Sequence, residues 1–438
     1  MGNEKKTQSN DIRIEKLCVD EVEIKAEKVE IKAEKVVGPS GSSSSPCPDE
    51  ICFKDLRRKL RKLEGQFISV TISGCCDIIQ GTIFRVDEGS LILNSGLGTR
   101  IIPICKISSI DACSVLAYVT NSGTLEALGN TVSVINTATD TVIATVTVGN
   151  APIGAAITPN GRRVYVPNQF DGTVSVIDTA TNTSIATIPV GIRPLLVAIT
   201  ADGTRAYVTN AGTVGVLDKS ISVIDTTTNT VVATITEGVG IFPFGIAIGN
   251  TPAGPRAYVA NTINGTVSII DVNPASPTFN TIIATITVGN GPIDVAITPD
   301  GTSVFVTNSG DGTVSTIDTA TNTVITVTVG AGPAGVGIGN TPEGTRAYVL
   351  NSEDDSISVI DASPNSPTFN TVIATITKGV GDSPSDAALT PDGRKVYVPN
   401  NLSNNVSVID TATNTIITTV PVGNNPNLVA VGRVCSQL

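Results

Sequence analysis

A five-residue phrase recurs seven times after residue 116, and it constrains the fold more than any other feature of the sequence. The copies read AYVTN, VYVPN, AYVTN, AYVAN, VFVTN, AYVLN and VYVPN, and they end at Asn121, Asn168, Asn210, Asn261, Asn308, Asn351 and Asn400. Successive copies are roughly 40–50 residues apart, which is the repeat length of a propeller blade.

Three further phrases complete each unit. An SVID-type phrase follows the pentapeptide and ends at Asn136, Asp178, Asp225, Asp271, Asp318, Asp361 and Asp410. Phrases of the types TNTVIATITVG and PxxVAITPDG come next. All four phrases are short, rich in β-branched residues and bounded by Gly, Asn, Asp or Pro, so each predicts a strand. The repeats therefore predict an all-β fold, with a seven-bladed β-propeller over residues 114–438.

The first unit lacks a VAIT-type strand of its own, because the chain runs from Cys113 almost directly into the first AYVTN. A matching strand occurs at the other end of the chain, in residues 427–433. We therefore expect this C-terminal strand to complete the first blade and to close the ring.

The cycle of YVTN, SVIDTATNT, ATITVG and PxxVAITPDG resembles the YVTN family of β-propeller repeats over about residues 114–438. The resemblance implies the propeller fold and a protein of a surface layer or another cell-surface structure. In each unit the repeated Asn ends a strand and the repeated Asp opens a hairpin. Both residue types bond their own backbone in turns and tolerate the left-handed conformation, which predicts a scaffolding role.

The chain contains no histidine. This removes the commonest general base and the commonest metal ligand, and no GxxxxGK[ST] phosphate loop is present. We expect no catalytic residue, no cofactor and no metal site in the repeats. One loop departs from the repeat and gathers three acids, Glu353, Asp354 and Asp355. It is either a solvated acidic loop or a contact for a hard cation such as calcium.

Charge is concentrated in the repeats. From residue 117 onward there are 11 Lys and Arg against 22 Asp and Glu, so this region carries the whole net charge of −11. An acidic surface argues against nucleic-acid partners, which are bound through Lys and Arg. No apolar run is long enough for a membrane span, and no apolar segment of the kind found in signal peptides follows Met1, so we expect neither a membrane span nor a secretory signal.

Units four and six share longer loops. The sequence around SPTFNTIIATIT (276–287) matches SPTFNTVIATIT (366–377), where the other units have a DTATNT hairpin. Surface loops tolerate changes of length, so we expect both loops to be dispensable for folding.

Residues 1–49 differ from the repeats. Two identical VEIKAEK heptads at 22–35 fit a helical seam or an alternating strand. A linker rich in Ser, Gly and Pro follows at 38–46. We expect a disordered or weakly structured arm.

Residues 50–113 have a pattern of their own. Phe53, Leu56, Leu60 and Leu63 are spaced as on a helix, and strands are expected at QFISVTIS, DIIQGTIFRV, GSLILNS, TRIIPI and ISSIDA. With Gly81, Asp87, Leu91 and Leu93, this segment resembles the Sm-like barrel. The resemblance implies ring formation, so we expect self-association through 50–112. The Asn that reads RNA in that family is missing, which leaves RNA binding in doubt. A monomeric SH3-like barrel is the alternative.

The cysteines lie outside the blades. Seven precede the propeller and Cys435 follows its last repeat. Cross-links between chains are expected at Cys18, Cys47, Cys52, Cys75, Cys76 and Cys435 if the compartment is oxidising. A zinc site of Cys47, Cys52, Cys75 and Cys76 has poor spacing, and Cys76 and Cys105 also fit a small core.

Two functions compete. In the first, the chain is a non-enzymatic structural or interaction protein of a bacterial surface layer. Because the small barrel is similar to domains of spore-coat proteins, the spore coat or exosporium is the expected location, with other surface or coat proteins as partners and the cytoplasm as the alternative location. In the second, the chain is a propeller enzyme of lactonase type, with a metal held in the central channel.

Overall fold

The computed structural model describes residues 67–72, 78–86, 90–95, 98–103, 107–213, 215–216 and 218–437. These residues form strands and turns and include no helix. In the described part of the chain, therefore, no helix is long and apolar enough to cross a membrane. The chain divides into two compact units, Met1–Cys113 with Gln437–Leu438, and Ser114–Ser436.

The first unit contains five antiparallel strands. They are β1 (Phe67–Ile72), β2 (Ile78–Val86), β3 (Ser90–Ser95), β4 (Gly98–Pro103) and the first part of β5 (Ile107–Gly123), in the order β4-β3-β2-β1-β5. All five occur where the sequence predicts strands. The expected helix over 53–63, the arm over 1–49 and the residues Asp87, Cys18, Cys47, Cys52, Cys75, Cys76 and Cys105 lie outside the described residues. The Sm-like barrel stays a prediction.

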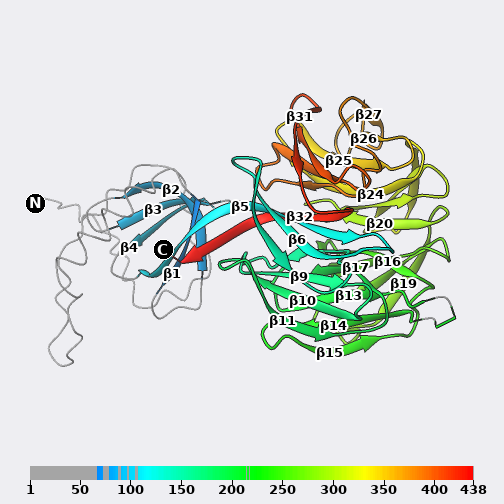
Figure 1. Cartoon of the computed structure of the whole chain (residues 1–438), viewed down its shortest axis with the longest axis horizontal. Helices are drawn as coiled ribbons and strands as arrows, with labels where there is room; N and C mark the ends of the chain where they lie inside the picture. Colours follow the sequence, from blue (N-terminus) through cyan, green and yellow to red (C-terminus); the bar gives the residue numbers. More distant parts are fainter. Residues whose placement is uncertain are drawn as a thin grey trace, which may run out of the picture. The chain divides into compact units, whose positions relative to one another are not determined.

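The second unit is a ring of seven blades, which confirms the predicted seven-bladed propeller (Figure 1). The first blade contains the second part of β5, β6 (Leu128–Asn136), β7 (Thr141–Thr147) and β32 (Pro426–Gln437). Blade 2 contains β8 (Ala156–Ile157), β9 (Arg163–Asn168), β10 (Thr173–Asp178) and β11 (Thr183–Pro189), and blade 3 contains β12 (Pro194–Ile199), β13 (Arg205–Asn210), β14 (Ser220–Asp225) and β15 (Thr230–Ile235). Blade 4 contains β16 (Pro243–Thr251), β17 (Gly254–Asn261), β18 (Thr266–Asp271) and β19 (Ile282–Thr287), and blade 5 contains β20 (Pro292–Ile297), β21 (Ser303–Asn308), β22 (Thr313–Asp318) and β23 (Val324–Thr328). Blade 6 contains β24 (Pro333–Thr341), β25 (Gly344–Asn351), β26 (Ser356–Asp361) and β27 (Val372–Ile376), and blade 7 contains β28 (Ala388–Leu389), β29 (Lys395–Asn400), β30 (Asn405–Asp410) and β31 (Thr415–Pro421).

The two ends of the propeller meet in the first blade. β32 pairs with β5, and the two strands lie side by side in Figure 1. Backbone N–H groups of Ser122 and Gly123 donate to the carbonyl oxygens of Asn425 and Asn424, each at 3.1 Å. The chain's last strand therefore supplies the innermost strand of its first blade.

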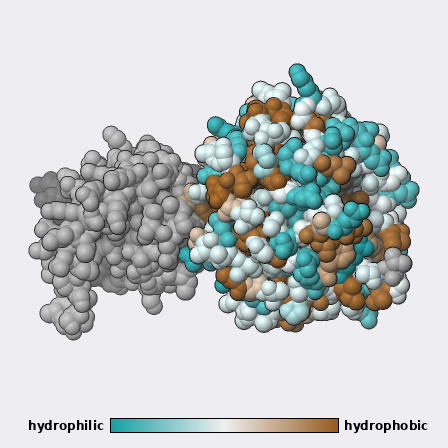
Figure 2. All heavy atoms as spheres, viewed as in Figure 1, coloured by the Kyte–Doolittle hydropathy of each residue, from teal (hydrophilic) through white to brown (hydrophobic). Residues whose placement is uncertain are grey.

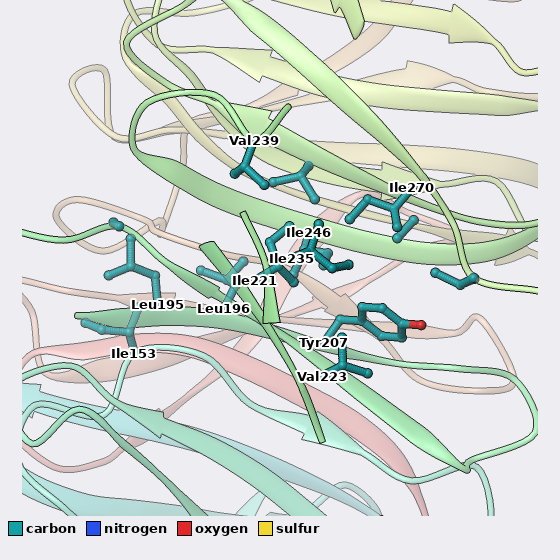
Figure 3. Packing of buried hydrophobic residues seen from close by; sticks show 14 residues of the cluster. Ile153, Leu195, Leu196, Tyr207, Ile221, Val223, Ile235, Val239, Ile246 and Ile270 are labelled. Atoms are coloured by element: carbon teal, nitrogen blue, oxygen red, sulfur yellow. The ribbon is translucent and has the colours of Figure 1, made fainter. Parts of the chain in front are cut away.

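The hydrophobic core lies between neighbouring blades. One cluster joins Tyr207 and Val223 of blade 3 to Ile246 and Ile270 of blade 4 (Figure 3). Along each middle strand, successive side chains point to opposite faces of the blade and so enter the cores on its two sides. The Tyr and Val side chains of these strands are fully buried. On the face shown in Figure 2, hydrophobic residues occur in small patches between hydrophilic ones. The ring is thus held by repeated pairwise packing of blades.

Candidate functional site

All seven pentapeptide Asn side chains are buried. Four of them also accept a hydrogen bond from the preceding blade, namely Asn168, Asn261, Asn308 and Asn351, whereas Oδ1 of Asn121, Asn210 and Asn400 has no partner. Asn168 Nδ2 donates to Thr173 Oγ1 at 3.0 Å and to Ser175 Oγ at 2.9 Å. Its Oδ1 accepts from the backbone N–H of Gly149, at the end of blade 1, at 3.1 Å. A Cβ on Gly149 would lie 2.6 Å from Asn168 Cγ, so no other residue fits there.

This arrangement corrects the expected backbone role of the repeated Asn. None of the seven Asn residues that end the pentapeptides has a positive φ. The left-handed residues instead include the Asn of the TATNT and TTTNT hairpins, Asn182, Asn229, Asn322 and Asn414. The pentapeptide Asn is chosen for its side chain, because that side chain is buried and can donate and accept at once.

In blades 1, 2, 3 and 6, the repeated Tyr bonds to an Asn of the next blade. In blade 7 Tyr397 bonds to Asp140 instead, and the buried hydroxyl of Tyr258 in blade 4 has no partner among the described residues. Tyr207 Oη donates to Asn280 Oδ1 of the next blade at 2.6 Å. Corresponding bonds connect Tyr118 to Asn182, Tyr165 to Asn229, and Tyr348 to Asn414. These hydroxyls are at the edge of the inter-blade core, and burial raises the pKa of Tyr207 far above its usual value.

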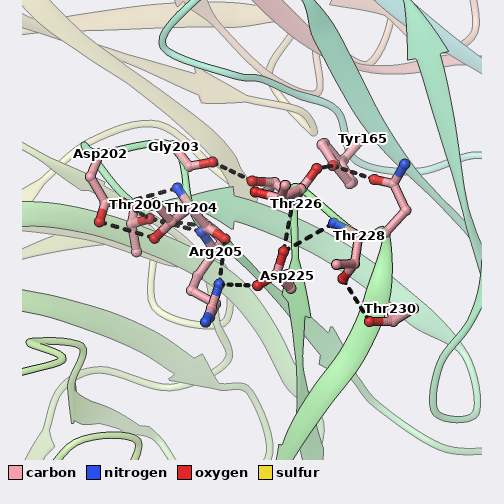
Figure 4. A network of polar contacts seen from close by, with 12 residues as sticks. Tyr165, Thr200, Asp202, Gly203, Thr204, Arg205, Asp225, Thr226, Thr228 and Thr230 are labelled. Carbon is pink, nitrogen blue, oxygen red and sulfur yellow. Dashed lines mark hydrogen bonds and ion pairs between the residues drawn. The ribbon is translucent and has the colours of Figure 1, made fainter. Parts of the chain in front are cut away.

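The repeated Asp forms the turn that the sequence predicts. Asp225 Oδ1 accepts from the backbone N–H groups of Thr227 and Thr228 at 2.9 and 3.0 Å (Figure 4). Arg205 Nη1 donates to Asp225 Oδ2 at 2.6 Å. The Thr228 and Thr227 amides, together with the Arg205 charge, hold the pKa of Asp225 below its usual value.

Two carboxylates of the acidic loop, residues 353–355, accept hydrogen bonds from the backbone of neighbouring loops. Asp354 Oδ2 accepts from Ala331 N at 2.5 Å, and Asp355 Oδ1 accepts from Ser383 N at 2.7 Å. Asp171 and Asp311, at the equivalent position of blades 2 and 5, likewise accept from the backbone N–H groups of Asn150 and Asn290. Two of the three acids thus have a structural partner. Cation binding by Glu353, Asp354 and Asp355 stays a prediction.

The inner strands carry two acids that the sequence reasoning missed. The third residue of the PxxVAIT phrase is Gly154, Leu196, Gly245, Asp294, Gly335, Asp386 and Leu428 in blades 2 to 7 and 1. Asp294 lies in β20 and Asp386 precedes β28, and both are buried. Their departure from Gly or Leu at one fixed position of the repeat was the available signal.

Each carboxylate is bonded to the next blade. Asp294 Oδ2 accepts from Val336 N of blade 6, and Asp386 Oδ2 accepts from Val429 N of blade 1, each at 2.9 Å. At Gly335, which lies between them in the ring, a Cβ would be 2.7 Å from Asp386 Cα. The inner strands are therefore in close backbone contact beside the two carboxyl groups.

Burial dominates the electrostatics of this pair. Loss of hydration, and then the Asp386 charge, raise the pKa of Asp294 from 3.8 to about 7. Loss of hydration likewise raises the pKa of Asp386, to about 6. The pair can hold a proton near neutral pH, because burial disfavours the ionised form of both carboxyl groups and, at Asp294, the Asp386 charge adds to this effect. Among the described residues, no group of three or more His, Cys, Asp or Glu side chains could hold a metal ion.

The fold and these bonds define a seven-bladed β-propeller with a buried acid pair in its inner strands. No protein-family model matches the sequence, and no curated protein resembles it significantly. The resemblance to the YVTN family remains a prediction.

Solved structures share the fold. Hydrazine synthase of Kuenenia stuttgartiensis is 24% identical, with a TM-score of 0.56 over 70% of this chain and 93% of that chain. A functionally unknown protein from Desulfotomaculum acetoxidans is 19% identical, with a TM-score of 0.62 over 73% and 98%. A "putative 6-phosphogluconolactonase" from Bacteroides uniformis is 16% identical, with a TM-score of 0.59 over 73% and 99%.

Proposed function

We propose that this chain is a non-enzymatic structural or interaction protein of a bacterial surface layer, with the spore coat or exosporium as its location. The observation that carries the proposal is the use of the repeated polar residues. The pentapeptide Asn, the hairpin Asn and the Tyr hydroxyl bond strand to strand and blade to blade. Residues repeated for this purpose build a rigid ring rather than seven binding sites.

Exposed apolar side chains on one set of loops support an interaction role. The loops between the second and third strands of a blade carry Leu125, Phe170, Ile263 and Leu402, which are 54–86% exposed. Strand direction alternates, so these loops share one end of the ring. These side chains come from blades 1, 2, 4 and 7, and apolar side chains exposed at one end of a ring are candidates for contact with another protein. Other surface or coat proteins are the partners proposed for this face.

Self-association is assigned to residues 50–112. The described strands of this segment form a small sheet with β4 at one edge. A domain of about 60 residues buries little surface alone and gains stability when its open edges pair with neighbours. Cross-linking of the assembly by Cys18, Cys47, Cys52, Cys75, Cys76 or Cys435 belongs to the same proposal.

Locating the protein in the cells that make it tests this function. Immunogold labelling of sporulating cells should place it on the spore surface, and extraction of purified spores with reductant should release it. Recovery from the cytoplasm alone, with none on the spore, would contradict the proposal.

A lactonase-type enzyme is the second candidate, because Asp294 and Asp386 place two buried carboxyl groups in the inner strands. Two solved structures that share the fold also carry the name "putative 6-phosphogluconolactonase". Lactone hydrolysis should be measured with and without added divalent cations. Activity lost in Asp294→Asn, but kept in the turn variant Asp318→Asn, would favour the enzyme.

A further inference from the structure

The outermost strand of every blade ends its sheet, so each of the seven presents an unpaired backbone edge. These strands are β7, β11, β15, β19, β23, β27 and β31. Proteins usually protect such edges with charged side chains, proline or a bulge. None of the seven contains a charged residue, so another device has to protect them.

In six blades that device is a β-bulge. In blade 1, Val134 pairs with Ala144 and Ile135 pairs with Val142, which leaves Ile143 between them without a partner. The equivalent unpaired residues are Ile185, Val232, Ile283, Ile373 and Ile417. A bulge bends the strand and breaks the regular spacing of the edge, which hinders pairing with another strand.

Blade 5 has no bulge. β23 pairs with β22 in unbroken register, from Thr313 opposite Thr328 to Ile317 opposite Val324. The sequence gives the reason, because this phrase reads TVITVTVG where blade 1 reads TVIATVTVG. The shorter phrase lacks one residue, and the bulge is absent with it.

The edge of β23 is also suited to pairing in its side chains. Ile325 is 54% exposed although it is paired in register with Thr316. The strand consists of Val, Ile and Thr, which favour strands, and it contains no proline. β11 and β31 end in Pro189 and Pro421 in addition to their bulges. β23 is therefore the one outer strand of the described propeller with no bulge, no charge and no proline.

We propose that β23 pairs edge to edge, antiparallel, with β23 of a second copy of this chain. Two propellers of net charge −11 repel each other, and β23 contains no charged residue, so a contact between copies through this edge places no like charges directly opposite one another. Antiparallel pairing of one strand with itself is two-fold symmetric and closes as a dimer. The proposal does not rest on the surface-layer function or on association through 50–112.

Restoring the bulge residue tests the pairing. One alanine inserted between Ile325 and Thr326 recreates the phrase of blade 1, so the variant should fold as well as the wild type. The full chain should be compared with this variant by light scattering over a range of concentrations. At high concentration the wild-type mass should be at least twice that of the variant, because each two-fold contact joins two chains, and an assembly with several such edges can join more than one other assembly.

A matched pair of point variants separates this edge from the others. Ile325→Lys should abolish the doubling, whereas Ile185→Lys, at the bulge of blade 2, should preserve it. Circular dichroism melting should show both variants folded. Equal masses for the wild type and the insertion variant at every concentration would overturn the proposal. An equal loss of mass in both lysine variants would also overturn it.

Discussion

At the scale of single residues, two departures from the repeat in blade 5 compensate for each other. Phe305 replaces the repeated Tyr, so this blade lacks the hydroxyl that bonds to the next blade. Thr316, which is opposite Phe305 in the register, replaces the usual Val or Ile. Its Oγ1 donates to Asn370 Oδ1 of blade 6 at 3.1 Å. The inter-blade bond is therefore kept by a different residue.

This compensation predicts a coupled pair of mutations. Thr316→Val should destabilise the propeller by about 1 kcal/mol, because the side chain of Asn370 loses a buried bond. Adding Phe305→Tyr should recover most of that loss, because the hydroxyl returns at the position used by the other blades. Denaturant unfolding of the single and double variants measures the coupling. Additive effects of the two substitutions would show that they are independent.

The buried acid pair predicts how stability depends on pH. The pKa of Asp294 is raised from 3.8 to about 7 in the folded protein. A raised folded pKa contributes stability that is present below pH 3.8 and is lost as the pH rises through about 7. Asp294→Asn should therefore be more stable than the wild type at pH 8, by at most about 4 kcal/mol. The difference should shrink at pH 4.

Thermal melts from pH 4 to pH 8 measure this effect. Asp318→Asn is a suitable control, because backbone and side-chain bonds from Thr321 hold the pKa of Asp318 below its usual value. That variant should gain nothing at pH 8. A constant difference between Asp294→Asn and the wild type across the range would contradict a proton-linked role.

At the scale of strands and loops, the sequence predicted where strands and turns lie along the chain better than it predicted which side chains the fold buries. Short β-branched phrases at a fixed period gave the blades, because strand pattern and turn residues are local properties. The burial of the pentapeptide Asn depends on the neighbouring blade, so turn preferences misled the interpretation. Asp294 and Asp386 escaped notice for a similar reason. They occupy a variable position whose neighbours come from other repeats.

The longer loops of blades 4 and 6 keep the one contact that matters to the ring. Asn280 and Asn370 end these loops in the left-handed conformation and accept the bond from the preceding blade. Replacing residues 271–281 by Asp-Val-Ala-Thr-Asn-Thr keeps the buried Val272 and should change stability by less than about 1 kcal/mol, because surface loops tolerate shortening.

The same replacement with Ala in place of its Asn provides the control. It should cost about 1 kcal/mol more, because Tyr207 Oη then lacks its acceptor. Denaturant unfolding of both loop variants distinguishes the loss of the loop from the loss of the bond. Equal stability of the two would mean that this bond contributes nothing to the ring.

At the scale of the whole molecule, the ring depends on its last strand. Removing residues 426–438 would leave the first blade without β32 and expose the edge of β5. Val429 and Val434 are buried, and each such side chain stabilises by about 1.5–3 kcal/mol. The truncated chain should melt at a lower temperature and aggregate. A soluble truncated chain with an unchanged melting temperature would show that the ring closes without β32.

The pairing of β32 with β5 has a mechanical consequence. The bonds from Ser122 to Asn425 and from Gly123 to Asn424 run in antiparallel register, so both strands leave the ring at the same end of blade 1. Tension between the two chain ends would therefore load this one pair of strands before the other six blades. Mechanical strain is thus concentrated in blade 1, and the other six blades are loaded only after it.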